Sequence, residues 1–174
     1  YSSFSLMSKG LSMAAKFILL LGVFGWCTFS SALPDDRKAP IKIISDRAEQ
    51  NEQEGTATYE GSVIVRQGSI KINADKVTVT TNTKEGDNIV ATGTPAHYQQ
   101  IQNTEEGLVL ASANTINYFL KNERIRLIRD ASLEQNGTTI TGDTIDYDLK
   151  AETVKASSGR NKKNRIEMVI PPTK

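Results

Sequence analysis

The side chains that most often perform catalysis are scarce in this sequence of 174 residues, which contains one histidine, His97, and one cysteine, Cys27. A lone histidine cannot build a His-rich metal site and weakens any Ser-His-Asp arrangement. Two carboxylates at the right separation would be enough for glycosidase chemistry, and Asp143 with Asp146 or Asp148 offers such a pair. Aromatic residues that could stack on sugar rings make up only 6% of the chain, and the sequence has no glycine-rich phosphate loop. We therefore predict a protein without catalytic residues, metal or cofactor, rather than an enzyme.

The first 32 residues have the pattern of a secretory signal peptide. A lysine-containing start leads into an apolar run at 17–29, and small residues follow it up to Ala32. We expect cleavage after Ala32, so that 1–32 is removed on export. Two alternatives stay open. One is a transmembrane anchor, although the run of 13 residues is shorter than the roughly 20 that span a bilayer. The other is a lipidated Cys27, although the bulky Trp26 precedes it.

The rest of the chain is nearly neutral and contains no cysteine. Two of the 21 basic residues lie in the predicted signal peptide, which leaves 19 against 20 acidic residues and a net charge of −1. This balance argues against nucleic acid as a partner. Without Cys27 no disulfide can form even in an oxidising compartment, but about 140 residues can bury a sufficient core. We expect a lead-in at 33–40, one domain at 41–171 and a short tail at 172–174.

Apolar and polar residues alternate with a period of two along most of this domain, as in half-buried β-strands. Val63 and Val65 share one face before a turn at 68–69, and the alternation resumes at Ile70 and Ile72. This pattern predicts a β-hairpin. Turn-forming residues recur every 8–12 residues, and no segment has the periodicity of a helix. The domain is therefore predicted to be an all-β sandwich, barrel or roll of many short strands.

An internal repeat is visible in the positions of four Asx residues, each of which we expect to begin a strand. Asp46 and Asp75 are 29 residues apart, and so are Asn114 and Asp143. The strands between them end near a glutamine. Chance offers an alternative explanation, because Asx residues occupy turns in any fold. A true repeat predicts stacked units that bury one continuous apolar seam and leave two open ends.

Four segments of the domain carry a resemblance to a known family: 40–46 (PIKIISD), 59–77 (YEGSVIVRQGSIKINADKV), 93–99 (GTPAHYQ) and 142–147 (GDTIDY). In these segments the sequence resembles the OstA-like domain of LptA-type periplasmic lipopolysaccharide-transport proteins, and the likeness extends over about 40–171. The resemblance implies an antiparallel β-jelly roll shaped like a twisted, open V. It also implies a periplasmic protein that carries lipopolysaccharide from an inner-membrane complex to an outer-membrane complex, whose components share the fold and join end to end.

Lipopolysaccharide transport would require an aliphatic groove for the acyl chains of lipid A and a polar rim. The residues predicted to line the groove are Ile41, Ile43, Val63, Val65, Ile72, Tyr98, Leu110 and Tyr118. Among them, the resemblance implies ligand contact for Ile41, Ile43 and Tyr98. The alternative is that most of these residues form an ordinary closed core. The cations that could meet lipid A phosphates at the rim are Lys42, Arg47 and Lys76, although such residues often only keep a strand surface soluble.

A structural adaptor of the same pathway, without a ligand groove of its own, is the alternative function. Its contacts would lie at the ends of the sheet, where 41–44 begins the fold and 165–170 ends it before Pro171 and Pro172. Proline cannot donate to a strand ladder and so limits an edge. We expect copies of the chain to associate head to tail through these edges, which is a heterologous contact that forms filaments.

Overall fold

The computed structural model describes residues 36–81, 84, 86–103, 107–159 and 165–172. The predicted signal peptide at 1–32 and its cleavage site lie outside these residues. The described residues form a short 3-10 helix and ten strands, and their bounds follow. They are η1 (Asp36–Lys38), β1 (Lys42–Ile44), β2 (Arg47–Asn51), β3 (Thr56–Gln67), β4 (Ile70–Thr80), β5 (Asn88–Asn103), β6 (Gly107–Phe119), β7 (Arg124–Gln135), β8 (Thr138–Asp148), β9 (Thr153–Ser157) and β10 (Glu167–Val169).

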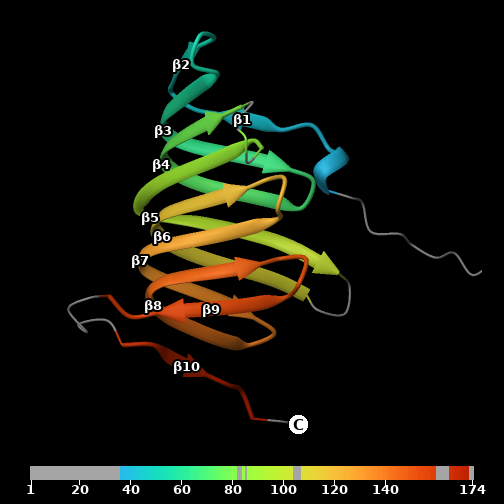
Figure 1. Ribbon diagram of the computed structural model, residues 1–174, viewed down its shortest axis with the longest axis vertical. Coiled ribbons are helices and arrows are strands. Elements are labelled where there is room, and N and C mark those ends of the chain that lie inside the picture. Colours follow the sequence, from blue (N-terminus) through green and yellow to red (C-terminus); the bar gives the residue numbers. More distant parts are fainter. Residues whose placement is uncertain (1–35, 82–83, 85, 104–106, 160–164, 173–174) are drawn as a thin grey trace, which may run out of the picture. The chain divides into compact units, whose positions relative to one another are not determined.

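All these strands belong to one antiparallel sheet with the order β1-β3-β4-β5-β6-β7-β8-β10. The short strands β2 and β9 pair with β3 and β8. From β3 to β8 each strand lies beside its neighbour in sequence, so that the strands stack in chain order along the domain (Figure 1). The prediction of an all-β, antiparallel fold is confirmed, as is the hairpin at 68–69.

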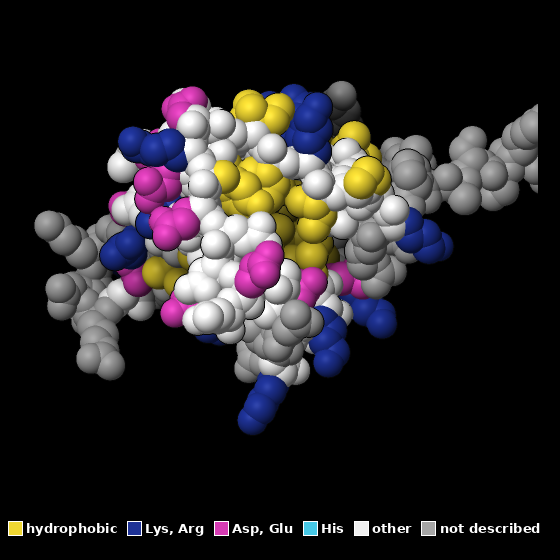
Figure 2. Space-filling view, turned by 90° about the horizontal axis from the view of Figure 1, so that it is seen from above, with side chains coloured by type: hydrophobic (Ala, Val, Ile, Leu, Met, Phe, Trp, Pro, Cys, Tyr) yellow, Lys and Arg dark blue, Asp and Glu magenta, His cyan; other side chains and the backbone are white. Residues whose placement is uncertain are grey.

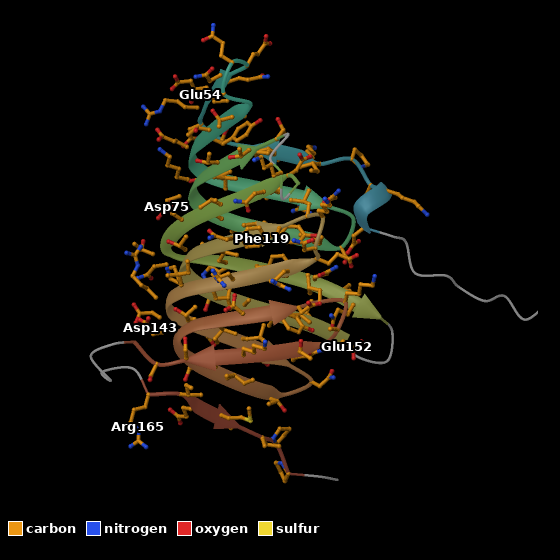
Figure 3. All side chains as sticks on the ribbon, in the orientation of Figure 1. Glu54, Asp75, Phe119, Asp143, Glu152 and Arg165 are labelled. Carbon is orange, nitrogen blue, oxygen red and sulfur yellow. The ribbon has the colours of Figure 1, made fainter. Side chains whose placement is uncertain are left out.

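The strands are longer than the sequence indicated, because most of them turn a corner halfway along. Asp75 lies within β4, Asn114 within β6 and Asp143 within β8, so the expectation that each begins a strand was wrong. The strand register shifts at these places, for example between Asn73 and Lys76. Such bulges break the ladder locally and bend the strand. Asp75 and Asp143 accordingly lie along the same side of the domain (Figure 3).

The corners divide the sheet into two half-sheets whose inner faces pack together. The first half-sheet contains β1, β10 and the segments 63–67, 70–73, 96–103, 107–113, 131–135 and 138–142. The second contains β2, β9 and the segments 56–60, 76–80, 88–92, 115–119, 124–128 and 144–148. The side opposite the corners, where the hairpin turns of the two half-sheets meet, is called the mouth below.

Gly61 shows why glycine is needed at one of these corners. Its φ is +85°, a conformation that residues with a side chain rarely adopt. A Cβ at this position would overlap the carboxylate of Asp46. The backbone N–H of Asp46 in turn donates to the carbonyl oxygens of Glu60 and Gly61, each at 3.1 Å. The first Asx residue of the repeat therefore ties the start of β2 to the corner of β3.

Candidate functional site

The inner faces of the two half-sheets form one apolar interior, which is closed over the middle of the domain. Five of the predicted groove residues lie there with exposed fractions of 0–2%, namely Val63, Val65, Ile72, Tyr98 and Tyr118. The rings of Tyr98 and Tyr118 come from opposite half-sheets and meet edge to face, with centroids 6.0 Å apart. In this structure the protein's own side chains fill the middle of the space that was predicted to hold ligand.

Three further groove candidates have different surroundings. Ile43 on β1 is partly buried and packs against the core. Ile41 precedes that strand and is 42% exposed, so the core does not bury it. Leu110 is 38% exposed on the outer face, where it lies opposite Gln99 and Glu134, so its predicted inward orientation was wrong. Its neighbour Val109, fully buried, occupies the inner position instead.

The interior reaches the surface at both ends of the domain. At the end that carries β2, apolar side chains gather in a hollow bordered mainly by other side chains and backbone, with charged side chains mostly farther out (Figure 2). At the other end lies a depression of about 280 Å³ lined by Leu133, Ile140 and Val154, with Gln135 at its side. Met168 of β10 pairs with Ile140 and is 54% exposed, so the apolar surface continues onto the last strand. The apolar interior is therefore accessible from both ends.

Hydrogen bonds join the two half-sheets across the mouth near the C-terminal end. The hydroxyl of Tyr147 donates to Oε1 of Gln102 at 3.0 Å, and Nε2 of Gln135 donates to the same oxygen at 2.8 Å. Nε2 of Gln102 donates to the carbonyl oxygen of Leu149 at 3.2 Å. Gln102 and Gln135 belong to the first half-sheet, so the bond between them orients the Gln102 amide, while the bonds of Gln102 with Tyr147 and Leu149 cross the mouth and hold it closed.

The lead-in covers the mouth near the N-terminal end. The carboxylate of Asp36, which is only 9% exposed, accepts hydrogen bonds from the backbone N–H and the hydroxyl of Ser69, each at 2.6 Å. It also accepts one from Nε2 of Gln100 at 3.0 Å, and Gln100 accepts one from the Tyr98 hydroxyl at 2.7 Å. Burial, followed by the influence of Tyr118 and Asp36, raises the pKa of Tyr98 well above its usual value, which keeps this donor protonated. Asp36 was not among the predicted site residues.

The three predicted rim cations lie on two different parts of the N-terminal end. Lys76 forms a salt bridge of 2.9 Å with Glu60, and Arg47 is the cross-strand partner of Glu60 on the other side. Lys42 lies on β1 opposite Arg66. The pKa of Glu60 is lowered, first by the hydrogen bond and the charge of Lys76. Lys76 is therefore partly neutralised, which leaves Lys42 and Arg47 as the better candidates for an anionic head group.

The single histidine, which the sequence offered as a candidate catalytic or metal-binding side chain, lies on the outer face. A shallow depression of about 310 Å³ there is lined by His97, Lys71, Ser112, Ser132 and other residues of β4 to β7. His97 is exposed and lies on the side of the sheet away from the interior. Among the residues that the structure describes, no group of three His, Cys, Asp or Glu side chains is arranged to hold a metal ion, and no helix is long and apolar enough to cross a membrane.

Comparisons with known proteins agree with this geometry. Residues 42–153 match the family profile described as LptA/(LptD N-terminal domain) LPS transport protein. The lipopolysaccharide export system protein LptH of Pseudomonas aeruginosa is 39% identical over 150 residues, which cover 82% of this chain and 85% of LptH. The corresponding protein LptA of Haemophilus influenzae is 33% identical over 168 residues, 94% of this chain and 95% of that protein. The crystal structure of LptH, the LptA-homologous periplasmic component of the P. aeruginosa lipopolysaccharide transport device, superposes with a TM-score of 0.73 at 35% identity, covering 80% of this chain and all of that one.

Proposed function

Because this chain belongs to the LptA/LptD N-terminal-domain family of lipopolysaccharide transport proteins, we propose that it carries lipopolysaccharide through the periplasm with the acyl chains held between its two half-sheets. It is a transport protein and not an enzyme. The observation that supports the acyl-chain site is the continuous apolar inner face, which runs from Ile43 at one end to Met168 at the other. The sugar and the phosphates would remain outside the mouth.

The lining suits such a cargo because it is mainly aliphatic. Each methylene that is removed from water contributes about 0.8 kcal/mol, so partial contact with several chains gives useful affinity without trapping the lipid. The phosphates of lipid A would lie near Lys42 and Arg47 at the N-terminal end. Export through cleavage after Ala32 would bring the chain to the periplasm.

The inner- and outer-membrane components that share this fold are the expected partners, together with further copies of the chain. Short edge strands at opposite ends support a head-to-tail contact, since within the described part of the chain β1 and β10 each have one unpaired side. Light scattering over a concentration series tests this contact. We expect the particle size to grow with concentration and an Ile166→Asp change to reduce that growth, because Ile166 is 47% exposed just before β10. A size that stays monomeric at every concentration would reject the contact.

The closed middle of the interior favours the adaptor function as the second candidate. Photocrosslinking separates the two functions, because β1 and β5 offer adjacent residues on opposite faces. A crosslinking residue at Ile43 or Tyr98 should capture lipopolysaccharide if the interior holds the acyl chains. The same residue at Ile44, 47% exposed, or at His97 should not. Equal capture at inward and outward positions would reject the groove and leave the adaptor.

A further inference from the structure

A row of glutamines follows the mouth on the inner face of the first half-sheet. Gln67 at the end of β3 pairs with Ile70, and Gln135 at the end of β7 pairs with Val109 of β6. Val109 also pairs with Gln100 of β5. Across neighbouring strands, amide side chains therefore alternate with buried aliphatic side chains. Because neighbouring strands are about 4.8 Å apart, an amide recurs roughly every 9.5 Å along the mouth.

Gln102 adjoins the row: the register of β5 against β6 shifts between Ile101 and Asn103, and the Gln102 side chain lies beside Gln135 and Tyr147, from which it accepts hydrogen bonds. All four amides are partly or fully buried, and Gln67 is only 7% exposed. Each amide donates to a group at the mouth itself: Gln67 to the carbonyl oxygen of Ala39, Gln100 to Asp36, Gln102 to the carbonyl oxygen of Leu149, and Gln135 to Gln102.

The stability of a closed core does not explain why amide side chains occupy these inner positions. Burying an amide gains little even when its hydrogen bonds are made, and an aliphatic residue would pack there at no such cost. The amides lie where the apolar interior meets water, and each can donate and accept. When the mouth opens, the bonds from Gln102 to Leu149 and from Tyr147 to Gln102 must break, which frees donors and acceptors at that boundary.

We propose that Gln67, Gln100, Gln102 and Gln135 form a hydrogen-bonding track for the boundary region of an acylated sugar, where amide and ester carbonyls and sugar hydroxyls adjoin the acyl chains. The proposal rests on the proposed transport function and names the part of the lipid that the mouth recognises. The amides exchange partners within the protein for partners on the lipid, so opening the mouth leaves few polar groups unpaired. Their spacing lets the lipid move from one amide to the next along the domain.

The test compares two ligands that share acyl chains and differ at the boundary. Binding of lipid A and of palmitate to the purified protein is measured by calorimetry for the wild type and for the Gln102→Leu/Gln135→Leu double variant. In the wild type the lipid replaces the hydrogen bonds that these amides lose on opening, whereas palmitate does not, so in the double variant the affinity for lipid A relative to that for palmitate should fall roughly tenfold or more. The affinity for palmitate should stay unchanged or rise, since its acyl chain needs only the apolar interior. The matched control is Gln99→Leu, an outward glutamine on β5, which should alter neither affinity.

The outcomes separate this proposal from the proposed function. A wild type that binds neither ligand would contradict the acyl-chain site. A wild type that binds both, with a double variant that keeps the same ratio of the two affinities, would overturn the glutamine track alone. If the double variant does not give a cooperative thermal melt, the single Gln102→Asn variant replaces it, since the shorter side chain keeps the amide but withdraws it from the mouth. An unchanged ratio in that variant would likewise overturn the track.

Discussion

Removal of the Asp36 carboxylate should detach the lead-in from the mouth and destabilise the domain. This carboxylate accepts three hydrogen bonds, two from Ser69 and one from Gln100. A hydrogen bond to a charged group contributes about 1.5–3 kcal/mol when it is fully buried. Ser69 and Gln100 are only partly buried, so water replaces part of what is lost, and Asp36→Ala should cost about 2 kcal/mol in all. For a domain of about 140 residues this corresponds to a fall in Tm of roughly 6–8 °C.

Two measurements check this expectation. A thermal melt followed by circular dichroism gives the change in Tm, and hydrogen exchange at the Ser69 amide reports the local contact, because this N–H should lose its protection. Glu49→Ala on the exposed strand β2 is the matched control, and it should leave both readouts unchanged. A Tm for Asp36→Ala equal to that of the control, together with unchanged protection of Ser69, would show that the lead-in does not hold the mouth.

Three further predictions follow. Ile72→Ala, at a position with 0% exposure, should lower the free energy of unfolding by about 3 kcal/mol through the cavity that it leaves, as urea titration would measure. Lys76 lowers the pKa of Glu60 in the folded protein below its ordinary value of 4.5, so this pair stabilises the fold above that pH and its contribution disappears on acidification. Glu60→Gln should therefore make the fall of Tm between about pH 5 and 3 shallower, and an unchanged slope would contradict the pairing. Gly61→Ala should destabilise the corner by about 1–3 kcal/mol, and adding Asp46→Ala should recover the part that comes from overlap with that carboxylate, which a double-mutant cycle of melts would show.

The alternation of apolar residues predicted the fold class and the first hairpin correctly, but it could not separate a corner from a turn. Both places interrupt the strand ladder, and Gly, Asp and Asn are common at both. At Asp75 and Asp143 the chain bends and continues in the same strand. Only the pairing of strands across the sheet, which a single sequence does not display, distinguishes the two.

The candidate site was predicted in part for a similar reason. Three consecutive apolar residues at 108–110 do not reveal which face is inner, and the structure assigns that face to Val109. Counting every second residue from the inward Tyr98 reaches Gln100 and Gln102. The alternation of inner and outer positions could therefore have identified the glutamine row. A polar residue at an expected inner position normally marks the end of the buried face, and for that reason no role was predicted for these amides.

Under the proposed function, the arrangement of bonds would let the closed interior accept a large lipid without unfolding. The backbone ladders run within each half-sheet, and the strands stay paired on both sides of the corners. Opening the mouth therefore leaves these ladders intact. Apolar contacts between the half-sheets would be exchanged for contacts with acyl chains, so the hydrophobic contribution changes little. The cost of opening then falls mainly on the polar groups at the mouth, which include the Gln102–Tyr147 bond and the contacts of Asp36. Variants of these side chains should consequently raise the rate of lipid entry as well as lower the stability of the closed domain.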